Sequence, residues 1–334
     1  MENQTPETLL AIKNLTTSFR IDGSYYPAVD NLDLTVNKNE VFAIVGESGC
    51  GKSALAMSII NLHNPNYTKL SGEINFKGQN ILALSESQMN KVRGADISMI
   101  FQDPLSALNP LIKIGAQIEE SLTYHTKMNA TEKKARALEL LHQVGLKDPE
   151  RSYDAFPHQL SGGMRQRVVI AIALSCKPDL IIADEPTTAL DVTIQSQILD
   201  LLRDLQAETQ SSIIMITHDL GVVAEIADRV AVMYAGQVVE VAPVLELFEN
   251  PQHPYTRSLL ASIPHADQEA KRLNAIKGIV PTLKYIPRTG CRFAPRTPWM
   301  PESAHQAEPT YHSISPTHQV LCTCHQSFKF EGEL

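Results

Sequence analysis

One eight-residue segment constrains this chain more than any other feature of its sequence. Gly46-Glu47-Ser48-Gly49-Cys50-Gly51-Lys52-Ser53 matches the pattern G-x-x-x-x-G-K-[ST]. It follows the apolar run Val41–Val45, which suits a strand buried on both faces, and it precedes an apolar helix expected to begin near Lys52. A plain glycine-rich turn is the alternative. The flanking strand and helix favour a phosphate-binding loop instead, at a helix N-terminus.

Each residue type in this loop has a distinct chemical use. Glycines let the backbone N–H groups surround a phosphate chain, Lys52 can reach the β- and γ-phosphates, and the Ser53 hydroxyl can ligate Mg²⁺. The residues expected to bind nucleotide here are Gly46, Ser48, Gly49, Cys50, Gly51, Lys52 and Ser53.

Three further buried apolar runs predict a parallel sheet. Leu180–Ala183, Ile213–Ile216 and Val230–Met233 are each separated from the next by a segment with helical spacing, which is typical of a doubly wound α/β fold. The first run ends in two carboxylates, Asp184 and Glu185. Asp184 suits Mg²⁺ bound through water, and Glu185 could polarise the water that attacks a γ-phosphate. The alternative is a solvated strand end.

The rest of the chain predicts three additions to this sheet. Short alternating runs at Leu10–Leu15 and Leu32–Val36 indicate an antiparallel β flank, and Thr131–Val144 is the best helix in a region where the strand signal fades. Crowded prolines after about residue 250 indicate a loop-rich extension. We therefore expect an α/β core over 1–88 and 161–249, a helical subdomain over 89–160, and a C-terminal extension over 250–334.

Composition excludes several classes of protein. With 29 Lys and Arg against 37 Asp and Glu, the 334-residue chain carries a net charge of −8, the wrong sign for a nucleic-acid-binding protein. Its apolar runs fall far short of the ~20 residues of a membrane span, and its N-terminus lacks a secretory signal. Five scattered cysteines suggest reduced thiols. We expect a cytoplasmic protein.

A second glycine segment offers another anion site. Leu160-Ser161-Gly162-Gly163-Met164-Arg165-Gln166-Arg167, called here the signature segment, leads into the apolar run Val168–Leu174. Ser161, Gly162 and Gly163 would thus present exposed N–H groups at a helix N-terminus. Taken alone, the segment would more often be a plain helix cap.

The order of these motifs along the chain resembles that of a known family. The phosphate loop, Gln102, the signature segment, Asp184-Glu185, Asp191 and His218 follow one another as in the ATP-binding-cassette (ABC) ATPases, which the chain resembles over residues 46–219. The resemblance implies a P-loop ABC cassette fold. It also implies that Gln102 senses Mg²⁺ and water, that Asp191 is the D-loop aspartate, and that His218 holds the γ-phosphate.

The resemblance implies two further assignments. Phe19 is similar to the aromatic residue that stacks on adenine, with Tyr25 and Tyr26 as alternatives. Met164 departs from the usual glutamine of the signature segment. In this family the signature segment faces the phosphate loop of a second cassette, so one chain supplies half of each site.

The C-terminal extension narrows the resemblance. Residues 250–260, 101–110 and 233–236 resemble the ATPase subunits of oligopeptide and dipeptide importers, a pattern that nickel importers share. This implies an ATPase, at the cytoplasmic face of the membrane, that uses ATP and Mg²⁺ to energise peptide uptake. Its implied partners are a second ABC ATPase subunit of different sequence, two transmembrane permease subunits and an extracellular or periplasmic substrate-binding protein. Alternatives are a nickel or other small-solute importer ATPase, a soluble ABC protein without a permease, and a regulatory module that hydrolyses nothing.

Many of these importer subunits hold an iron–sulfur cluster on four cysteines. Here Cys291 and Cys324 match that set, but Thr297 and Ala304 occupy the second and third positions. Cys322 could replace one ligand, and His305, His312 or His325 leave a mixed-ligand cluster or a zinc site open. We expect no [4Fe–4S] cluster, because four thiolates or close substitutes are needed.

Overall fold

The computed structural model describes residues 7–188, 190–263, 276–301, 305 and 308–331. These residues divide into two compact units. Unit 1 holds the described residues of Met1–Leu10, Val36–Val41 and Phe76–Ile216, and unit 2 holds those of Ala11–Thr35, Phe42–Asn75 and Thr217–Leu334. Units defined by packing need not coincide with ranges defined by motifs, so the three expected domain ranges stay a prediction. No helix among the described residues is long and apolar enough to cross a membrane.

Unit 1 is built on parallel strands. Strand β6 (Ile97–Ile100) pairs with β7 (Leu180–Asp184), which pairs with β8 (Ser212–Thr217), in registers that place Ile97 opposite Leu180 and Asp184 opposite Ile216. All residues of β7 and β8 are buried, which explains their continuous apolar sequences. Strand β6 lies inside the range expected to be helical.

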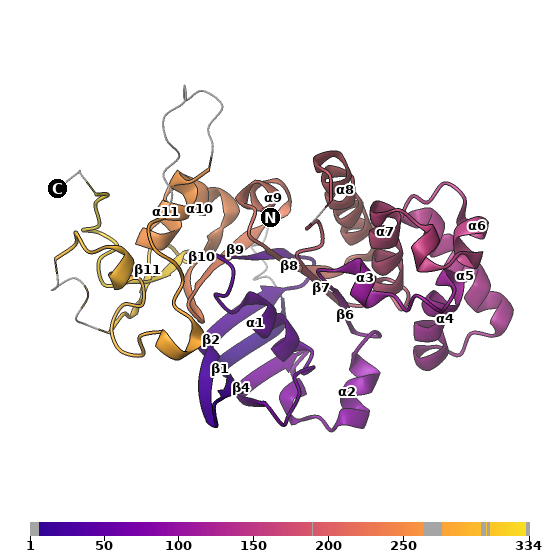
Figure 1. The fold of residues 1–334 in the computed structure, drawn as a ribbon, viewed down its shortest axis with the longest axis horizontal. Helices are drawn as coiled ribbons and strands as arrows, with labels where there is room; N and C mark the ends of the chain where they lie inside the picture. The colour runs from indigo at the N-terminus through magenta and orange to yellow at the C-terminus, as the bar shows by residue number, and fades with distance from the viewer. Residues whose placement is uncertain (1–6, 189, 264–275, 302–304, 306–307, 332–334) are drawn as a thin grey trace. The chain divides into compact units, whose positions relative to one another are not determined.

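Helices make up most of the remainder of unit 1. In α5 (Ala130–Gln143), an Asn129–Glu132 capping box starts the helix, and Ala137, Leu140 and Leu141 form its buried stripe. Helices α4 to α7 pack on one another at one end of this unit (Figure 1). The other elements of this unit are β5 (Gln79–Asn80), η1 (Ile81–Ala83), α2 (Glu86–Val92), α3 (Pro104–Ala107), α4 (Ile114–His125), α6 (Pro149–Asp154), η2 (Pro157–Gln159), α7 (Gly162–Ala173) and α8 (Val192–Thr209).

Unit 2 contains both parallel and antiparallel strand pairs. Strand β3 (Val41–Val45) pairs in parallel with β9 (Arg229–Tyr234), and β10 (Gln237–Pro243), β12 (Gln319–Leu321) and β11 (Tyr311–Ser313) continue the sheet in antiparallel fashion. The last two strands belong to the extension expected to be loop-rich. The other elements here are α1 (Lys52–Ile59), α9 (Leu220–Ile226), α10 (Val244–Glu249), α11 (Pro254–Ala261), η3 (Leu283–Tyr285) and η4 (Ala294–Arg296).

A second sheet carries the expected β flank, in the order β2, β1, β4 (Thr68–Phe76). Strands β1 (Thr8–Ile21) and β2 (Ser24–Asn37) are joined through Asp22 and Gly23, whose φ angles of 48° and 85° suit a tight hairpin turn. The three strands lie side by side in Figure 1. The flank is present, and its strands are longer than the alternating runs that predicted it.

Unit 2 buries an aromatic cluster of three rings. Tyr234 ends β9, Tyr255 lies in α11 and Phe293 precedes η4, and their ring centroids are 4.6 to 5.5 Å apart. All three side chains are at most 3% exposed. The cluster therefore attaches the C-terminal extension to the sheet.

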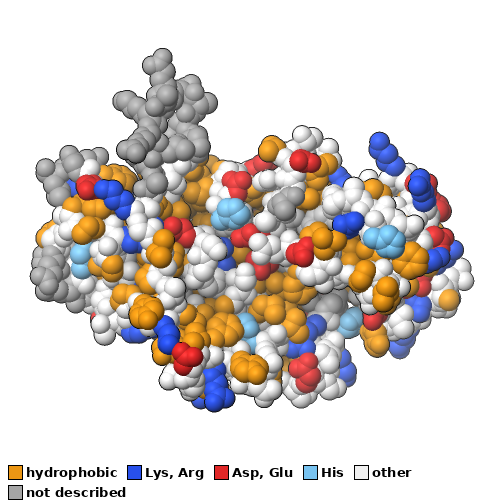
Figure 2. All heavy atoms as spheres, viewed as in Figure 1, with side chains coloured by type: hydrophobic (Ala, Val, Ile, Leu, Met, Phe, Trp, Pro, Cys, Tyr) orange, Lys and Arg blue, Asp and Glu red, His pale blue; other side chains and the backbone are white. Residues whose placement is uncertain are grey.

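On the face that Figure 2 shows, acidic and basic side chains of the described residues are interspersed.

Candidate functional site

The phosphate loop occupies the turn between β3 and α1, as expected. Gly46, Gly49 and Gly51 have φ angles of 155°, 80° and 109°, which L side chains rarely adopt. A Cβ on Gly46 would lie 2.2 Å from the Met233 carbonyl oxygen. Helix α1 begins at Lys52, and its N-cap Gly51 makes no side-chain cap bond. The loop thus has the backbone of an anion-binding helix start.

Lys52 folds back over this loop. Its ammonium donates to the carbonyl oxygens of Gly46 at 2.7 Å and Glu47 at 3.1 Å, and the side chain is buried. Ser53, one residue further, is exposed. Cys50 is buried beneath the loop, and burial raises the pKa of its thiol. A phosphate group would compete with the two carbonyls for the Lys52 ammonium.

In unit 1, the structure brings Gln102 and Glu185 together. The Gln102 amide donates to Glu185 Oε2 at 2.9 Å, and the Thr188 hydroxyl donates to the same oxygen at 2.8 Å. Glu185 has a φ angle of 49°, and its N–H donates to the Ile216 carbonyl at 2.9 Å. A non-glycine residue in this conformation is strained, and such residues cluster at active sites.

Asp184 and Thr188 complete this part of unit 1. Asp184 is the last residue of β7 and is 6% exposed. Sequence reasoning did not select Thr188. Its signal was its position three residues after Glu185, where a short turn brings the hydroxyl back to the carboxylate.

The signature segment starts a helix, as predicted. Ser161 is the N-cap of α7, and its hydroxyl accepts from the Met164 N–H at 3.3 Å. A Cβ on Gly162 would meet nothing within 4 Å, whereas one on Gly163 would lie 3.0 Å from Ile194. Both Ser161 and Gly162 are exposed, so this helix start is accessible.

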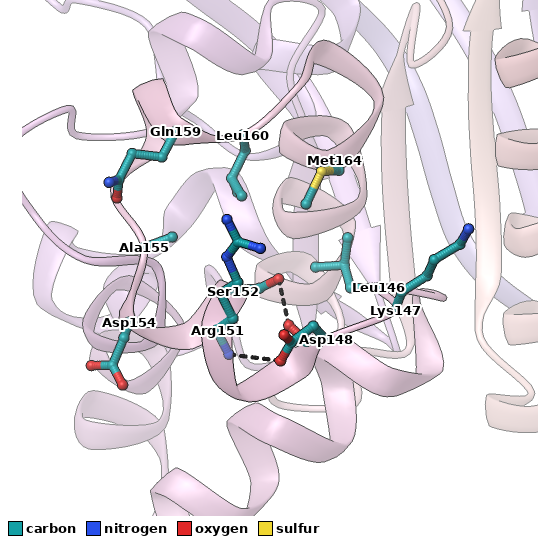
Figure 3. Close-up of a pocket in the computed structure, with 10 residues that line it drawn as sticks. All are labelled: Leu146, Lys147, Asp148, Arg151, Ser152, Asp154, Ala155, Gln159, Leu160 and Met164. Carbon is teal, nitrogen blue, oxygen red and sulfur yellow. Dashed lines mark hydrogen bonds between the residues drawn. The ribbon is translucent and has the colours of Figure 1, made fainter.

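A cavity of about 700 Å³ adjoins the signature segment (Figure 3). Leu146, Leu160 and Met164 give it apolar walls, and Arg151 points toward Leu160 within it. Asp148 accepts from the Arg151 N–H at 3.1 Å, so its carboxylate caps a helix. This mixed lining differs from the glycine-rich backbone of the phosphate loop.

His218 and Asp191 both lie at helix starts. His218 follows β8 and is exposed, and the cap of α9 is Asp219, whose carboxylate accepts from the Gly221 N–H at 2.8 Å. Asp219 is thus the residue that caps α9. Asp191 is exposed at the N-cap position of α8 and makes no side-chain cap bond.

The three aromatic candidates for adenine stacking are all half-buried. The Phe19 ring meets His63 edge-on, with centroids 5.3 Å apart, and the Lys69 ammonium lies 4.1 Å from the centroid of the Tyr25 ring. Tyr26 is on the same strand as Tyr25. Phe19 stays the predicted stacking residue, since no contact in the structure decides among the three.

The C-terminal cysteines form a pair. The Cys322 and Cys324 sulfurs are 3.8 Å apart and both side chains are buried. Within the described ranges, no group of three or more His, Cys, Asp or Glu side chains is arranged to hold a metal ion. Thr297 is buried, and Ala304 lies outside the described residues. The side chains described here do not fit a four-thiolate cluster, and its expected absence remains a prediction.

Comparison with known proteins identifies the family. Residues 29–188 match the model of the ABC transporter family, and residues 239–300 match the C-terminal region of oligopeptide/dipeptide transporters. The chain is 50% identical, over 98% of its length and 97% of the relative's, to the oligopeptide transport ATP-binding protein OppD of Lactococcus lactis subsp. cremoris (strain SK11). The chain belongs to the ABC transporter ATP-binding proteins.

Other relatives agree with this membership. The chain is 48% identical to the dipeptide transport ATP-binding protein DppD of Bacillus subtilis (strain 168), over 95% of this chain and 94% of that one. A solved dimeric ATP-binding cassette, in a post-hydrolysis state with ADP and Pi, is 31% identical with a TM-score of 0.63, covering 70% of this chain and 98% of that chain. The predicted ABC cassette fold is thus confirmed, and the protein is an ABC-type ATPase.

Proposed function

We propose that this ABC ATPase hydrolyses Mg-ATP to energise the import of oligopeptides or dipeptides through a membrane permease. The main support for this substrate class is the 50% sequence identity, over nearly the whole of both chains, to a protein named for oligopeptide transport. The match of residues 239–300 to the C-terminal region of oligopeptide/dipeptide transporters supports the same class.

Each motif has a role in this proposal. Lys52 leaves the Gly46 and Glu47 carbonyls and binds the β- and γ-phosphates, while Phe19 stacks on adenine. Ser53, Gln102 and Asp184 offer the oxygen donors that Mg²⁺ prefers. When bound, the metal neutralises phosphate charge.

Hydrolysis depends on Glu185 and His218. Glu185 accepts a proton from the attacking water, and its bonds from Gln102 and Thr188 fix the direction of the carboxylate. His218 binds the γ-phosphate. Asp191 lies at the start of α8, where it would face the second cassette.

A second cassette completes each site. The exposed N-terminus of α7, at Ser161, Gly162 and Gly163, binds the γ-phosphate held by the opposite phosphate loop. ATP therefore favours the closed pair, and closure moves the permease. We propose a different chain as the second cassette, two permease subunits, a substrate-binding protein outside the cell, and a location at the cytoplasmic face of the membrane.

Uptake by the complete transporter tests the substrate class. Proteoliposomes that contain this chain, the second cassette and the permease would be supplied with substrate-binding protein, ATP and a labelled oligopeptide or, separately, labelled Ni²⁺. We expect peptide uptake with the wild-type chain and none with Lys52→Ala. Uptake of Ni²⁺ without peptide would reject the peptide assignment in favour of the nickel importer.

A further inference from the structure

Glu47, the second residue of the phosphate loop, makes hydrogen bonds through its N–H, its carbonyl oxygen and its carboxylate. Its N–H donates to the Tyr255 hydroxyl at 2.8 Å, and its carbonyl accepts from the Lys52 ammonium at 3.1 Å. Its carboxylate accepts two hydrogen bonds from the Arg296 guanidinium, at 2.5 and 3.1 Å. Two of the three partners thus come from the C-terminal extension, about 200 or more residues away along the chain.

Tyr255 is fixed by its surroundings. It is fully buried in α11 and packs against Tyr234 and Phe293, with ring centroids 4.6 and 5.5 Å away. Burial raises the pKa of its hydroxyl well above the ordinary value, so this group stays protonated. The Tyr255 oxygen therefore offers the Glu47 N–H a neutral acceptor at a fixed position.

Arg296 is equally constrained. Its side chain is 4% exposed. Its Nε donates to the Lys277 carbonyl oxygen at 2.7 Å, and Nη2, which also donates to Glu47, lies 3.3 Å from the carbonyl oxygens of Ile276 and Gly278. Its guanidinium lies 5.8 Å from the centroid of the Phe293 ring. Burial lowers the pKa of Arg296, but its interaction with the Glu47 carboxylate helps to outweigh this effect, so the pKa is raised. The guanidinium is thus a fixed cation aimed at Glu47.

The charge of Glu47 explains why such a cation is needed. A carboxylate in a loop that binds phosphates would repel the triphosphate of ATP. A bidentate guanidinium both neutralises the carboxylate and holds it away from other partners. Without Arg296, the free carboxylate could also compete for the Lys52 ammonium, whose Nζ already bonds the Glu47 carbonyl.

We propose that Arg296 and Tyr255 of the C-terminal extension are positioning residues for the phosphate loop, and that they set its affinity for ATP through Glu47. This inference rests on the proposed binding of ATP at that loop. The extension therefore affects nucleotide binding indirectly, through its contacts with Glu47 of the phosphate loop. Neither residue touches the nucleotide in this account.

The test is equilibrium binding of Mg-ATP to the full-length chain. We expect Arg296→Gln to weaken binding about tenfold, the scale of one lost charge-assisted interaction. Adding Glu47→Gln to that variant should restore affinity to within about threefold of wild type, because it removes the unpaired carboxylate. Tyr255→Phe should weaken binding about threefold by leaving the Glu47 N–H without its acceptor.

Arg288→Gln is the matched control. Arg288 lies in the same extension and donates to the Asp30 carboxylate at 3.1 Å, but the structure shows no hydrogen bond from its side chain to the phosphate loop. Its loss should leave the affinity for ATP within twofold of wild type. In the assembled transporter, Arg296→Gln should raise the KM for ATP while kcat at saturating ATP stays within twofold.

Three results would count against the inference. Wild-type affinity in Arg296→Gln would reject it, and so would a weakened Arg296→Gln that Glu47→Gln fails to rescue, since Arg296 would then act only on folding. Failure of the wild-type chain to bind ATP at all would reject the proposed function as well. If the wild-type chain binds ATP normally and Arg296→Gln binds it with the same affinity, only this inference is rejected and the proposed function stands.

Discussion

At the scale of single residues, Glu185 is one of several non-glycine residues with a left-handed backbone, and it is the one at the candidate catalytic position. A glutamate with a φ angle of 49° costs about 1–3 kcal/mol, and the surrounding bonds must hold it there. The Ile216 carbonyl binds its N–H, and Gln102 and Thr188 fix one carboxylate oxygen. The position of Glu185 after a buried strand predicted the residue, whereas the strain and the Thr188 contact depend on the turn that follows and could not be predicted.

Glu185→Gln tests the role of that carboxylate. The amide keeps the shape and an oxygen acceptor for Gln102 and Thr188, so we expect ATP binding to persist. Turnover in the assembled complex should fall at least ~100-fold, the usual scale for losing a positioned base. Phosphate release measures it, and Glu208→Gln on the exposed face of α8 is the control. Turnover within tenfold of wild type would reject Glu185 as the base.

At the scale of secondary-structure elements, long apolar runs were the reliable signal. The buried runs predicted β3, β7, β8 and β9 almost to their ends, and the glycine segments predicted the starts of α1 and α7. Strand β6 was missed because Ile97–Ile100 is only four residues long. Strands β11 and β12 were missed because prolines surround them, and their pairing with β10 is a tertiary effect. The Asp22-Gly23 pair was an available hairpin signal for the full length of β1 and β2.

Helix α11 depends on an uncharged histidine. His253 Nδ1 accepts the Tyr255 N–H at 3.0 Å and so caps the helix, which requires the neutral ring. Burial lowers the pKa of His253 from 6.5 to about 4, although the nearby Glu240 carboxylate opposes this shift. The unfolded chain then binds a proton more readily than the folded chain. The resulting stability is fully present above pH 6.5 and is lost as pH falls toward 4.

His253→Asn should reduce this pH dependence, because asparagine can cap the helix without titrating. Between pH 7.5 and pH 5, we expect the free energy of unfolding of the wild type to fall about 2 kcal/mol more than that of the variant. Denaturant melts at both pH values provide the comparison. Parallel losses in the two proteins would show that His253 is not buried in its neutral form.

The segment with Cys291, Cys322 and Cys324 should fold without a [4Fe–4S] cluster. Two vertices of a cubane would lack a sulfur ligand at Thr297 and Ala304, and Cys322 could replace only one of them. Anaerobic purification followed by metal analysis and an absorption scan checks this expectation, with a melting curve to confirm folding. A broad band near 400 nm with about four iron atoms per chain would show the ligand set to be wrong.

At the scale of the whole molecule, one phosphate loop and one signature segment occur in 334 residues. Their order along the chain identified an ABC cassette, and the C-terminal extension indicated the importer type. No pattern in one chain could reveal the Glu47, Tyr255 and Arg296 contacts, because they join residues about 200 or more positions apart. The sequence also does not encode the partner cassette, on which hydrolysis is proposed to depend.

The rate of phosphate release per chain tests this dependence most directly. It would be measured for the isolated protein over a wide range of concentrations, and for the assembled transporter with binding protein and peptide. We predict negligible turnover by the isolated chain at concentrations too low for pairing, and substantial turnover in the complex. Equal turnover per chain in the dilute isolated protein and in the complex would contradict the account, because a single cassette would then form a complete site.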